Sequence, residues 1–252
     1  MDTRDCVEFI DDKSRNIVKR KHEQSVIDSF SRYMERSASD SGRQVTRCSL
    51  DGQDTVLGAD YIFTNHTKIL MVEFKYEKSD IEHEAKKPRR LKLCRILDAE
   101  DIRRKLSLQC HYVAWSEVIE IDLAKKRGVN FNAYYAEVCN QAIFGKSSGL
   151  MRERAHDGLM LKAQHLVEDF LSGGLGTDFV NFERYTDWLM SLEGSGEAGI
   201  ELIVDHPDRG ELLLMEFSSV GDLKTWLDST NYEPPKLTPK SKSGGFSGPR
   251  MG

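Results

Sequence analysis

The sequence lacks features that identify several large classes of protein. No apolar run reaches about 18 residues, so we expect no transmembrane helix. Residues 1–5 are mostly charged and no apolar segment follows them, so we expect no signal peptide. The P-loop pattern GxxxxGK(S/T) is absent, which argues against a P-loop NTPase. These absences favour a cytoplasmic protein without a membrane partner.

Cysteine is sparse and irregularly spaced. No two cysteines form a CxxC pair, and the five of them are Cys6, Cys48, Cys94, Cys110 and Cys139. This pattern favours reduced, mostly structural thiols and argues against a zinc knuckle or a disulfide framework.

The composition is that of an ordinary globular protein, but the charge is unevenly distributed. The 252 residues suit one large domain or two small ones, and 39% are apolar and 31% charged. The net charge of −5 does not indicate a nucleic-acid-binding protein. However, residues 86–105 contain nine Lys and Arg against three Asp and Glu. Such a segment can follow a phosphate backbone, although a solvated helix face is the alternative.

The most informative stretch of the chain is residues 58–75. Two segments rich in β-branched and aromatic residues, 61–63 and 69–74, flank a polar turn at 64–68. This pattern predicts a β-hairpin. If the turn is centred between residues 66 and 67, Asp60 lies opposite Glu73, and Lys75 projects from the same face as Glu73.

These three charged residues are anomalous in strands whose faces are otherwise apolar. Strands of this kind are buried on both sides. Burying Asp60, Glu73 and Lys75 there costs several kcal/mol unless the charges pair or bind a metal. Two carboxylates beside an ammonium group suit a hard divalent cation and a phosphate. The alternative is a buried salt bridge between Lys75 and either Glu73 or Asp60.

A second anomaly is a carboxylate on a predicted helix. Residues 15–37 have apolar side chains at helical spacing, and Glu23 lies on the line of that apolar stripe. Glu23 either faces the interior or lies at the edge, where it reaches solvent or pairs with Lys19 or Arg20.

The rest of the N-terminal half alternates between strands and helices. We expect a loop at 37–42, a strand at 44–50, a turn at 51–54, a mobile polar connection at 77–87 and a strand at 110–116. Residues 98–101 resemble an N-cap with acid in the first turn, and the helix that they open is expected to bury Ile102 and Leu106. We interpret His111 as a core residue rather than a ligand. The expected order is helix, three strands, helix, strand.

The C-terminal half is expected to be an α+β region. The pattern predicts helices at 131–144, 159–171 and 179–192, a hairpin at 199–217 with its turn at 207–210, and a short helix from about 219 to 227. The tail from residue 232 lacks apolar periodicity and is expected to be disordered. We therefore expect a core at 1–126, a C-terminal region at 127–231 and a tail at 232–252.

An Asp followed thirteen residues later by Glu-x-Lys, on a hairpin preceded by a Glu-bearing helix, resembles the PD-(D/E)xK nuclease superfamily. The resemblance covers residues 15–119, somewhat under half of the chain. It implies an α/β fold with a restriction-endonuclease-like core. One departure is that Gly58 and Ala59 precede Asp60, where the family name implies a proline.

The resemblance also implies an activity, the hydrolysis of phosphodiester bonds. Asp60, Glu73 and the backbone carbonyl of Phe74 are implied ligands of Mg²⁺ or Mn²⁺. Glu23 is implied to bind a second metal or to orient a metal-bound water, and Lys75 to position the attacking water and stabilise phosphate charge. The residues expected to bind the nucleic-acid backbone are Lys86, Lys87, Arg89, Arg90, Lys92 and Arg95.

The expected partner is nucleic acid, DNA in preference to RNA. The acidic C-terminal region is expected to bind a protein partner or to form a homo-oligomer. By analogy with the family, such a nuclease serves as an effector of antiviral defence or of repair. One alternative is a catalytically silent nuclease-fold subunit that acts as a protein-interaction scaffold. Another is a nucleic-acid-binding module without cleavage, which fits the basic segment but not the buried carboxylates.

Overall fold

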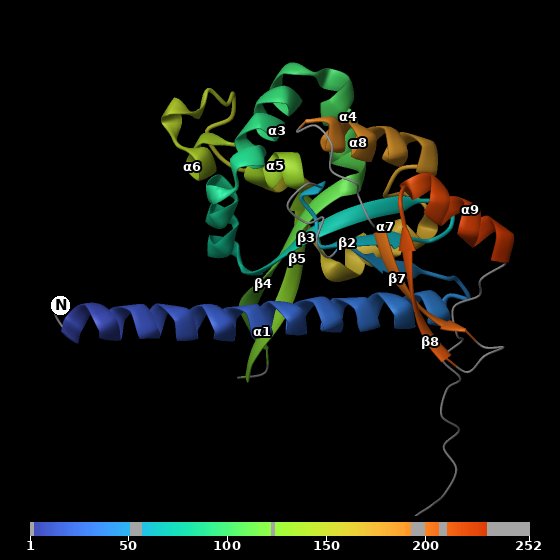
Figure 1. The fold of residues 1–252 in the computed structure, drawn as a ribbon, viewed down its shortest axis with the longest axis horizontal. Coiled ribbons are helices and arrows are strands. Elements are labelled where there is room, and N and C mark those ends of the chain that lie inside the picture. The colour runs from blue at the N-terminus through green and yellow to red at the C-terminus, as the bar shows by residue number, and fades with distance from the viewer. Residues whose placement is uncertain (1–2, 51–56, 122–123, 193–199, 207–210, 231–252) are drawn as a thin grey trace, which may run out of the picture.

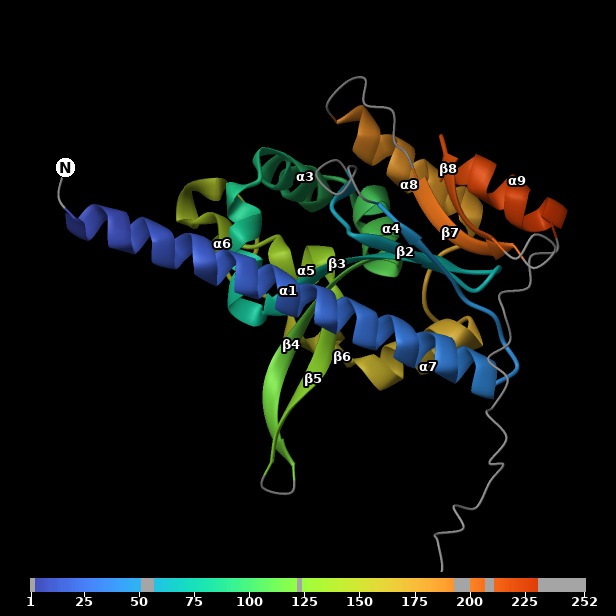
Figure 2. The same cartoon turned by 60° about the horizontal axis from the view of Figure 1, so that its bottom comes forward.

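The computed structural model is an α/β fold in which helices cover both faces of a mixed sheet (Figures 1 and 2). It describes residues 3–50, 57–121, 124–192, 200–206 and 211–230. The strands are β1 (Thr46–Ser49), β2 (Tyr61–Thr64), β3 (Ile69–Glu77), β4 (His111–Ile121), β5 (Ala124–Ala133), β6 (Leu161–Lys162), β7 (Ile200–His206) and β8 (Glu211–Phe217). The helices are α1 (Thr3–Asp40), α3 (Pro88–Ala99), α4 (Asp101–Cys110), α5 (Tyr134–Val138), α6 (Gln141–Phe144), α7 (Ala163–Ser172), α8 (Phe179–Ser191) and α9 (Val220–Thr230). Short 3-10 helices are η1 (Lys78–Lys86), η2 (Lys146–Ser148) and η3 (Asp157–Leu159).

The described strands form one sheet in the order β6-β5-β4-β3-β2-β1-β7-β8. Strands β3 and β4 are parallel, and the other neighbouring pairs are antiparallel. The crossover from β3 to β4 runs through η1, α3 and α4, as a parallel pair requires a long connection. The expected order of helix, three strands, helix and strand is therefore present, with α3 as an additional helix.

The predicted register of the central hairpin is confirmed. Tyr61 pairs with Val72 and Thr64 with Ile69, and the N–H of Asp60 donates to the carbonyl of Val72 at 2.9 Å. The turn is fixed by the Asn65 side chain, whose Oδ1 accepts hydrogen bonds from two backbone N–H groups of the turn. Its next residue, His66, takes a left-handed conformation with φ of 70°.

Two apolar cores lie on opposite faces of the sheet. Leu70, Val72 and Phe74 of β3 belong to the core that α1 and α7 cover. Met71 belongs to the core beneath α3, α4, α5, α8 and α9. Because side chains alternate along a strand, Glu73 and Lys75 share the face of Met71. The charged residues of β3 therefore point toward the crossover and not toward α1.

Several predicted boundaries in the N-terminal half are wrong. Helix α1 continues to Asp40 through the segment that we expected to be a loop. The polar segment 77–87 is not a mobile connection, because it forms η1 and buries Asp80, Ile81 and Glu84. Ile102 is 75% exposed, whereas Leu106 is half-buried against the core, and α4 buries Ser107 and Cys110 of its last turn. In each case the local sequence pattern does not show which other element packs against the segment.

The expected boundary between two regions at 126/127 falls inside β5. Strands β4 and β5 form a long hairpin paired from Tyr112↔Ala133 to Ile121↔Ala124 (Figure 2). The segment 131–144 is not one helix, since β5 runs to Ala133 and two short helices follow. The β5–β6 and β7–β8 pairs extend the sheet at its two edges. The C-terminal half is therefore part of the same sheet as the N-terminal half.

Other predictions for the C-terminal half are confirmed. Helix α8, the β7–β8 hairpin and α9 lie close to their predicted ranges. Gly173 ends α7 in a left-handed conformation, as a glycine after a helix predicts. The start of the predicted helix 159–171 is wrong, because residues 161–162 form β6 and α7 begins at Ala163. The expected turns at 51–54 and 207–210 and the tail from residue 232 lie outside the described residues. None of the described helices is long and apolar enough to cross a membrane.

The expectation of reduced thiols is wrong for two cysteines. Cys94 of α3 and Cys139, which follows α5, form a disulfide across 45 residues of sequence. Cys48 and Cys110 are free and buried. The sequence spacing could not reveal the pair, because only the packing of α3 against α5 brings the two residues together.

Candidate functional site

The predicted cluster of Asp60, Glu73 and Lys75 forms at the hairpin. Asp60 precedes β2, and its Oδ2 accepts a hydrogen bond of 2.6 Å from the backbone N–H of Phe74. On β3, the ammonium group of Lys75 donates to Oε1 of Glu73. Glu73 is 1% exposed and Lys75 is 8% exposed. The cross-strand register places Asp60 next to β3, and the alternation of side chains along β3 places Glu73 and Lys75 on the same face.

The two carboxylates of the cluster have opposite electrostatic environments. Burial, and next the charge of Glu73, raise the pKa of Asp60 well above its usual range. Burial also raises the pKa of Glu73, but the charges of Lys75 and other cations outweigh it and hold this pKa below its usual range. Glu73 is therefore the ionised member, and Asp60 is the carboxyl group that resists ionisation.

Glu23 of α1 interacts electrostatically with the same cluster. Its side chain is half-buried, and burial raises its pKa. The charge of Lys75 lowers this pKa and that of Glu73 raises it. The charge of Glu23 in turn raises the pKa of Asp60. The four predicted residues are thus electrostatically linked, although Glu23 belongs to the helix layer opposite η1.

A buried carboxylate that the sequence did not indicate, Glu84 of η1, lies at the centre of the surrounding network. Its Oε1 forms ion pairs with Lys75 at 3.2 Å and Lys87 at 2.9 Å. Its Oε2 accepts hydrogen bonds from Arg90 Nε at 3.2 Å and from the Tyr134 hydroxyl at 2.7 Å. The residues before Glu84 are polar and carry no helical or strand periodicity, so no local signal marked it for burial.

Gly58 has a structural role that explains why a small residue precedes Ala59 and Asp60. It has a φ of +80°, and a Cβ at this position would lie 2.7 Å from Nη1 of Arg90. Its carbonyl accepts a hydrogen bond of 2.8 Å from Nε2 of His111. A larger side chain here would displace the Arg90 guanidinium from the network.

The interpretation of His111 as a core residue is confirmed. The ring is fully buried, it stacks on Tyr134, and its Nδ1 lies 3.1 Å from the hydroxyl of Tyr185. Burial lowers the pKa of His111 to about 3, so the imidazole is neutral at physiological pH. In this form Nε2 carries the proton donated to Gly58, and Nδ1 accepts from Tyr185.

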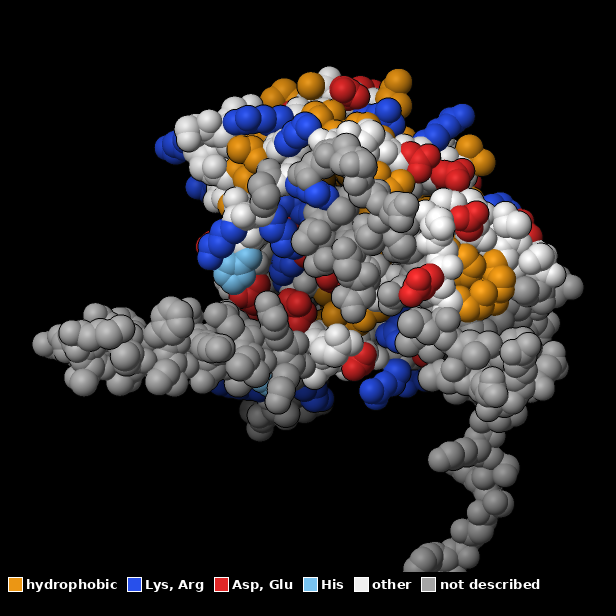
Figure 3. Space-filling view, in the orientation of Figure 1, with side chains coloured by type: hydrophobic (Ala, Val, Ile, Leu, Met, Phe, Trp, Pro, Cys, Tyr) orange, Lys and Arg blue, Asp and Glu red, His pale blue; other side chains and the backbone are white. Residues whose placement is uncertain are grey.

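The basic segment is distributed between the surface and the interior. Figure 3 shows Lys and Arg side chains gathered near η1 and α3 on the face presented there. Lys86, Lys92 and Arg95 are exposed, and the last two donate hydrogen bonds to the carbonyls of Leu192 and Ser148. The predicted backbone-binding residues that are not exposed are Lys87, Arg89 and Arg90.

Arg90 does not belong to a phosphate-facing surface. It is 1% exposed and its guanidinium is bonded to Glu84. The expectation that it binds a nucleic-acid backbone needs correction, because a side chain enclosed by the protein cannot reach a phosphate. Its charge instead serves the buried network, where it lowers the pKa of Glu73.

A divalent cation such as Mg²⁺ needs several oxygen donors grouped around one point. Within the described residues, no three His, Cys, Asp or Glu side chains are grouped to hold a metal ion. The resemblance implies three carboxylates, Asp60, Glu73 and Glu23, and these are not grouped in that way. The smaller set that remains is Asp60, Glu73 and the backbone carbonyl of Phe74. Among the described residues, Oε2 of Glu73 is buried without a hydrogen-bond partner. Mg²⁺ accepts one or two carboxylates and keeps several waters, so these donors fit such an ion.

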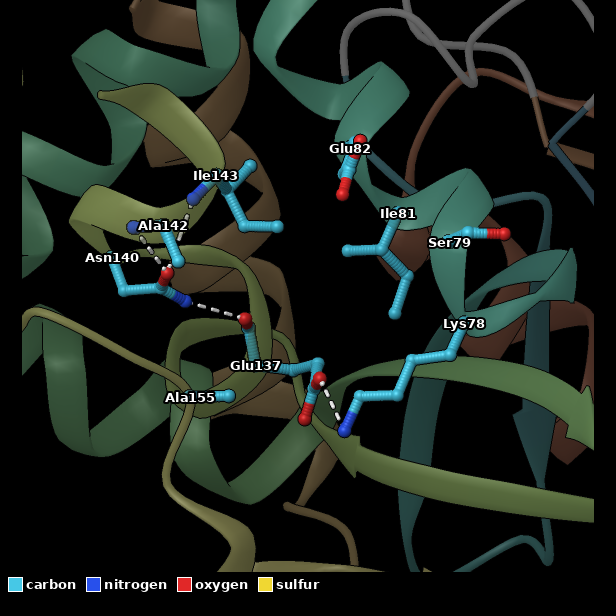
Figure 4. Close-up of a pocket in the computed structure, with 9 residues that line it drawn as sticks. All are labelled: Lys78, Ser79, Ile81, Glu82, Glu137, Asn140, Ala142, Ile143 and Ala155. Carbon is cyan, nitrogen blue, oxygen red and sulfur yellow. Dashed lines mark hydrogen bonds and ion pairs between the residues drawn. The ribbon is translucent and has the colours of Figure 1, made fainter.

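A separate pocket of about 230 Å³ lies between η1 and the segment that follows α5 (Figure 4). Its walls include Ile81, Ile143 and the charged pair Lys78–Glu137, whose closest atoms are 3.2 Å apart. Glu137 also accepts a hydrogen bond of 2.8 Å from Asn132. Both carboxylate oxygens of Glu137 therefore have partners within the protein.

Two short glycine patterns do not add a site. Residues 145–149 read GxSxG with Ser147 as the serine, but they lie after α6 and in η2 rather than at a strand-to-helix turn. Residues 194–199 read GxGxxG and lie outside the described residues.

No protein-family model, curated protein or solved structure matches this chain. The Asp60–Glu73–Lys75 cluster is therefore the candidate functional site of the described residues.

Proposed function

We propose that this protein is a metal-dependent nuclease of the PD-(D/E)xK type, with a restriction-endonuclease-like core and Mg²⁺ or Mn²⁺ as its cofactor. The observation that carries the proposal is the convergence of Asp60, Glu73 and Lys75 in a buried hairpin, with one carboxylate oxygen of Glu73 left without a partner. The order of α1, β1 to β3, the crossover helices and β4 supports the same assignment. The proposed substrate is nucleic acid, DNA in preference to RNA.

In the proposed reaction, the residues act on a water molecule and a phosphodiester. Asp60, Glu73 and the Phe74 carbonyl are the groups that would hold the ion, which when bound supplies Lewis acidity and a water of lowered pKa. Lys75, held by Glu73 and Glu84, would orient the attacking water and stabilise charge on the phosphate. Glu23 of α1, which lies in the helix layer opposite η1, would orient the water. The water oxygen forms a bond to phosphorus as the bond to the leaving oxygen breaks.

The proposal is tested with the purified full chain and its single variants. We expect cleavage of DNA with Mg²⁺ or Mn²⁺ and none with EDTA, and RNA is assayed in parallel. Lys75→Met and Asp60→Ala should each abolish cleavage. Lys224→Met is the matched control, because among the described residues Lys224 forms an ion pair only with Asp228, and it lies on α9, away from the site.

Circular dichroism must show that each inactive variant remains folded. Equal cleavage by wild type and Lys75→Met would contradict the proposal, because the activity would then come from other residues or from a contaminant. Failure to bind Mn²⁺ in the wild-type protein, measured by calorimetry, would contradict the metal site itself.

A specific observation also favours a second candidate, the catalytically silent scaffold. The ammonium of Lys75 is paired with Glu73, and Lys87 bonds to the same carboxylate at 2.8 Å. A buried network of this kind can serve structure alone. The two candidates differ in their response to metal, because a scaffold network gains no stability from Mn²⁺, whereas a metal site does.

A further inference from the structure

Lys87 differs from the other cations of the buried network in its access to solvent. It occupies the N-cap position of α3, and its side chain is 30% exposed, against 9% for Lys75 and 1% for Arg90. Its ammonium group lies 2.8 Å from Oε1 of Glu73 and 2.9 Å from Oε1 of Glu84. Lys87 therefore lies at the solvent-facing end of the network.

Two ammonium groups share one oxygen of Glu73. Lys75 and Lys87 both bond to Oε1, while Oε2 is buried without a hydrogen-bond partner. A positive charge this close to the carboxylate opposes the binding of a further cation to it. A divalent ion at Oε2 of Glu73 would repel both ammonium groups, and the repulsion would be relieved if one of them moved away. Lys87 can do so because it reaches solvent and has a flexible four-carbon stem.

We infer that Lys87 couples metal binding to phosphate binding. In the metal-free site its ammonium neutralises Glu73 and Glu84, and in the metal-loaded site it bonds to a phosphate oxygen of the nucleic acid. Lys87 is thus a counter-ion that the metal displaces and the substrate then uses. This inference rests on the proposed nuclease function and adds to it an order of events, in which the metal prepares the site for phosphate.

The first test measures metal affinity alone. Mn²⁺ is titrated into wild type, Lys87→Met and the control Lys224→Met by calorimetry. Lys87→Met should bind Mn²⁺ about tenfold more tightly than wild type, because a competing positive charge has been removed. Lys224→Met should equal wild type. A residue with only a structural role would leave the affinity unchanged or weaken it.

The second test measures binding of a fluorescent DNA duplex against salt concentration. In Ca²⁺, with the duplex checked for integrity on a gel, the slope of log K against log salt should be smaller by about 0.9 for Lys87→Met, as expected when one phosphate contact is lost. In EDTA, the slopes of wild type and Lys87→Met should agree, because Lys87 then remains with Glu73 and Glu84.

The outcomes separate this inference from the proposed function. If wild type binds no Mn²⁺, the metal-dependent function fails and the coupling fails with it. If wild type binds Mn²⁺ but Lys87→Met binds it no more tightly, or if the salt slopes agree in Ca²⁺, the coupling is wrong while the nuclease proposal stands. If Lys87→Met does not fold, Lys87→Gln replaces it with the same expectations, since its amide can still bond to Glu84.

Discussion

At the scale of single residues, the central feature is an aspartate held where its charge is disfavoured. Burial and the neighbouring Glu73 raise the pKa of Asp60, while its hydrogen bond from Phe74 stabilises the carboxylate only in part. Lys75 and Lys87 bond to Glu73, but among the described residues no hydrogen bond or ion pair joins either of them to Asp60. The metal-free site is therefore arranged to gain free energy when a cation arrives next to Asp60.

The first prediction concerns Asp60→Asn in the absence of metal. The folded pKa of Asp60 is raised, so the wild type loses stability as pH rises above about 3.9, the unfolded value, and the loss is complete above the folded pKa. Asparagine does not titrate and can still accept the bond from Phe74. The melting temperature of Asp60→Asn should therefore equal or exceed that of wild type at pH 7, with the difference shrinking on acidification.

Metal reverses the order of these two proteins. Mn²⁺ at about 100 times its dissociation constant should stabilise wild type by about 2.7 kcal/mol and Asp60→Asn by much less. Thermal melts with and without Mn²⁺ measure both effects. A large destabilisation by Asp60→Asn without any response to metal would favour the scaffold function.

The second prediction concerns Glu23→Gln. Glu23 is half-buried with a raised pKa, so replacing it by a neutral isostere should leave the metal-free melting temperature equal or slightly higher at pH 7. Cleavage should fall, because an amide is a poor ligand and a poor base. Glu35→Gln, an exposed residue on the same helix, is the control and should leave both quantities unchanged. Full cleavage by Glu23→Gln would remove Glu23 from the site.

At the scale of secondary-structure elements, the crossover between β3 and β4 does more than connect two parallel strands. It places Glu84 of η1 and Arg90 of α3 against the hairpin, and both are buried. Arg90 also covers Gly58 in the segment that leads to Asp60. The crossover therefore fixes the position of the buried Arg90 and, through its contact with Gly58, the position of the segment that leads to Asp60.

The third prediction follows from this arrangement. Arg90→Met removes the partner of a buried carboxylate and should lower the free energy of unfolding by about 3 kcal/mol, since breaking a buried ion pair typically costs 3–5 kcal/mol. Urea denaturation monitored by fluorescence measures the change. Lys92→Met, on the exposed side of the same helix, should change it by less than about 0.5 kcal/mol. Equal stability of the two variants would mean that the Arg90–Glu84 pair does not contribute to the fold.

At the scale of the whole molecule, segments from both halves of the chain complete one sheet. Strands β5 and β6 extend it on one side and β7 and β8 on the other. The disulfide between Cys94 and Cys139 adds a covalent link between α3, which carries Arg90, and the end of α5. The layer that holds the site is thereby tied to the C-terminal half.

The fourth prediction concerns that disulfide. Closing a loop across 45 residues restricts the unfolded chain, and the chain-entropy model gives about 4 kcal/mol for such a loop as an upper value. Reductant should therefore lower the urea midpoint of wild type. The Cys94→Ala/Cys139→Ala variant should not respond to reductant. Thiol titration in denaturant should find three free thiols before reduction and five after it, and five in both samples would contradict the disulfide.

The sequence alone predicted the central hairpin and its three charged residues. Alternating apolar positions and a polar turn determine the register locally, so Asp60 could be placed next to Glu73 without any tertiary information. Local sequence patterns likewise predicted α8 and α9, which are amphipathic, and the glycine that ends α7. Glu23 could be identified as unusual because it interrupts an apolar stripe.

Only the tertiary structure decided what surrounds the hairpin. Glu84 and Arg90 lie in a polar, charged segment, and their burial depends on partners from β3 and α5 that are distant in sequence. The Cys94–Cys139 pair and the joining of both chain halves in one sheet likewise depend on long-range packing. Periodicity reports which side of an element is apolar. It does not report which other element will cover that side, so the network around the site could not be derived from the sequence.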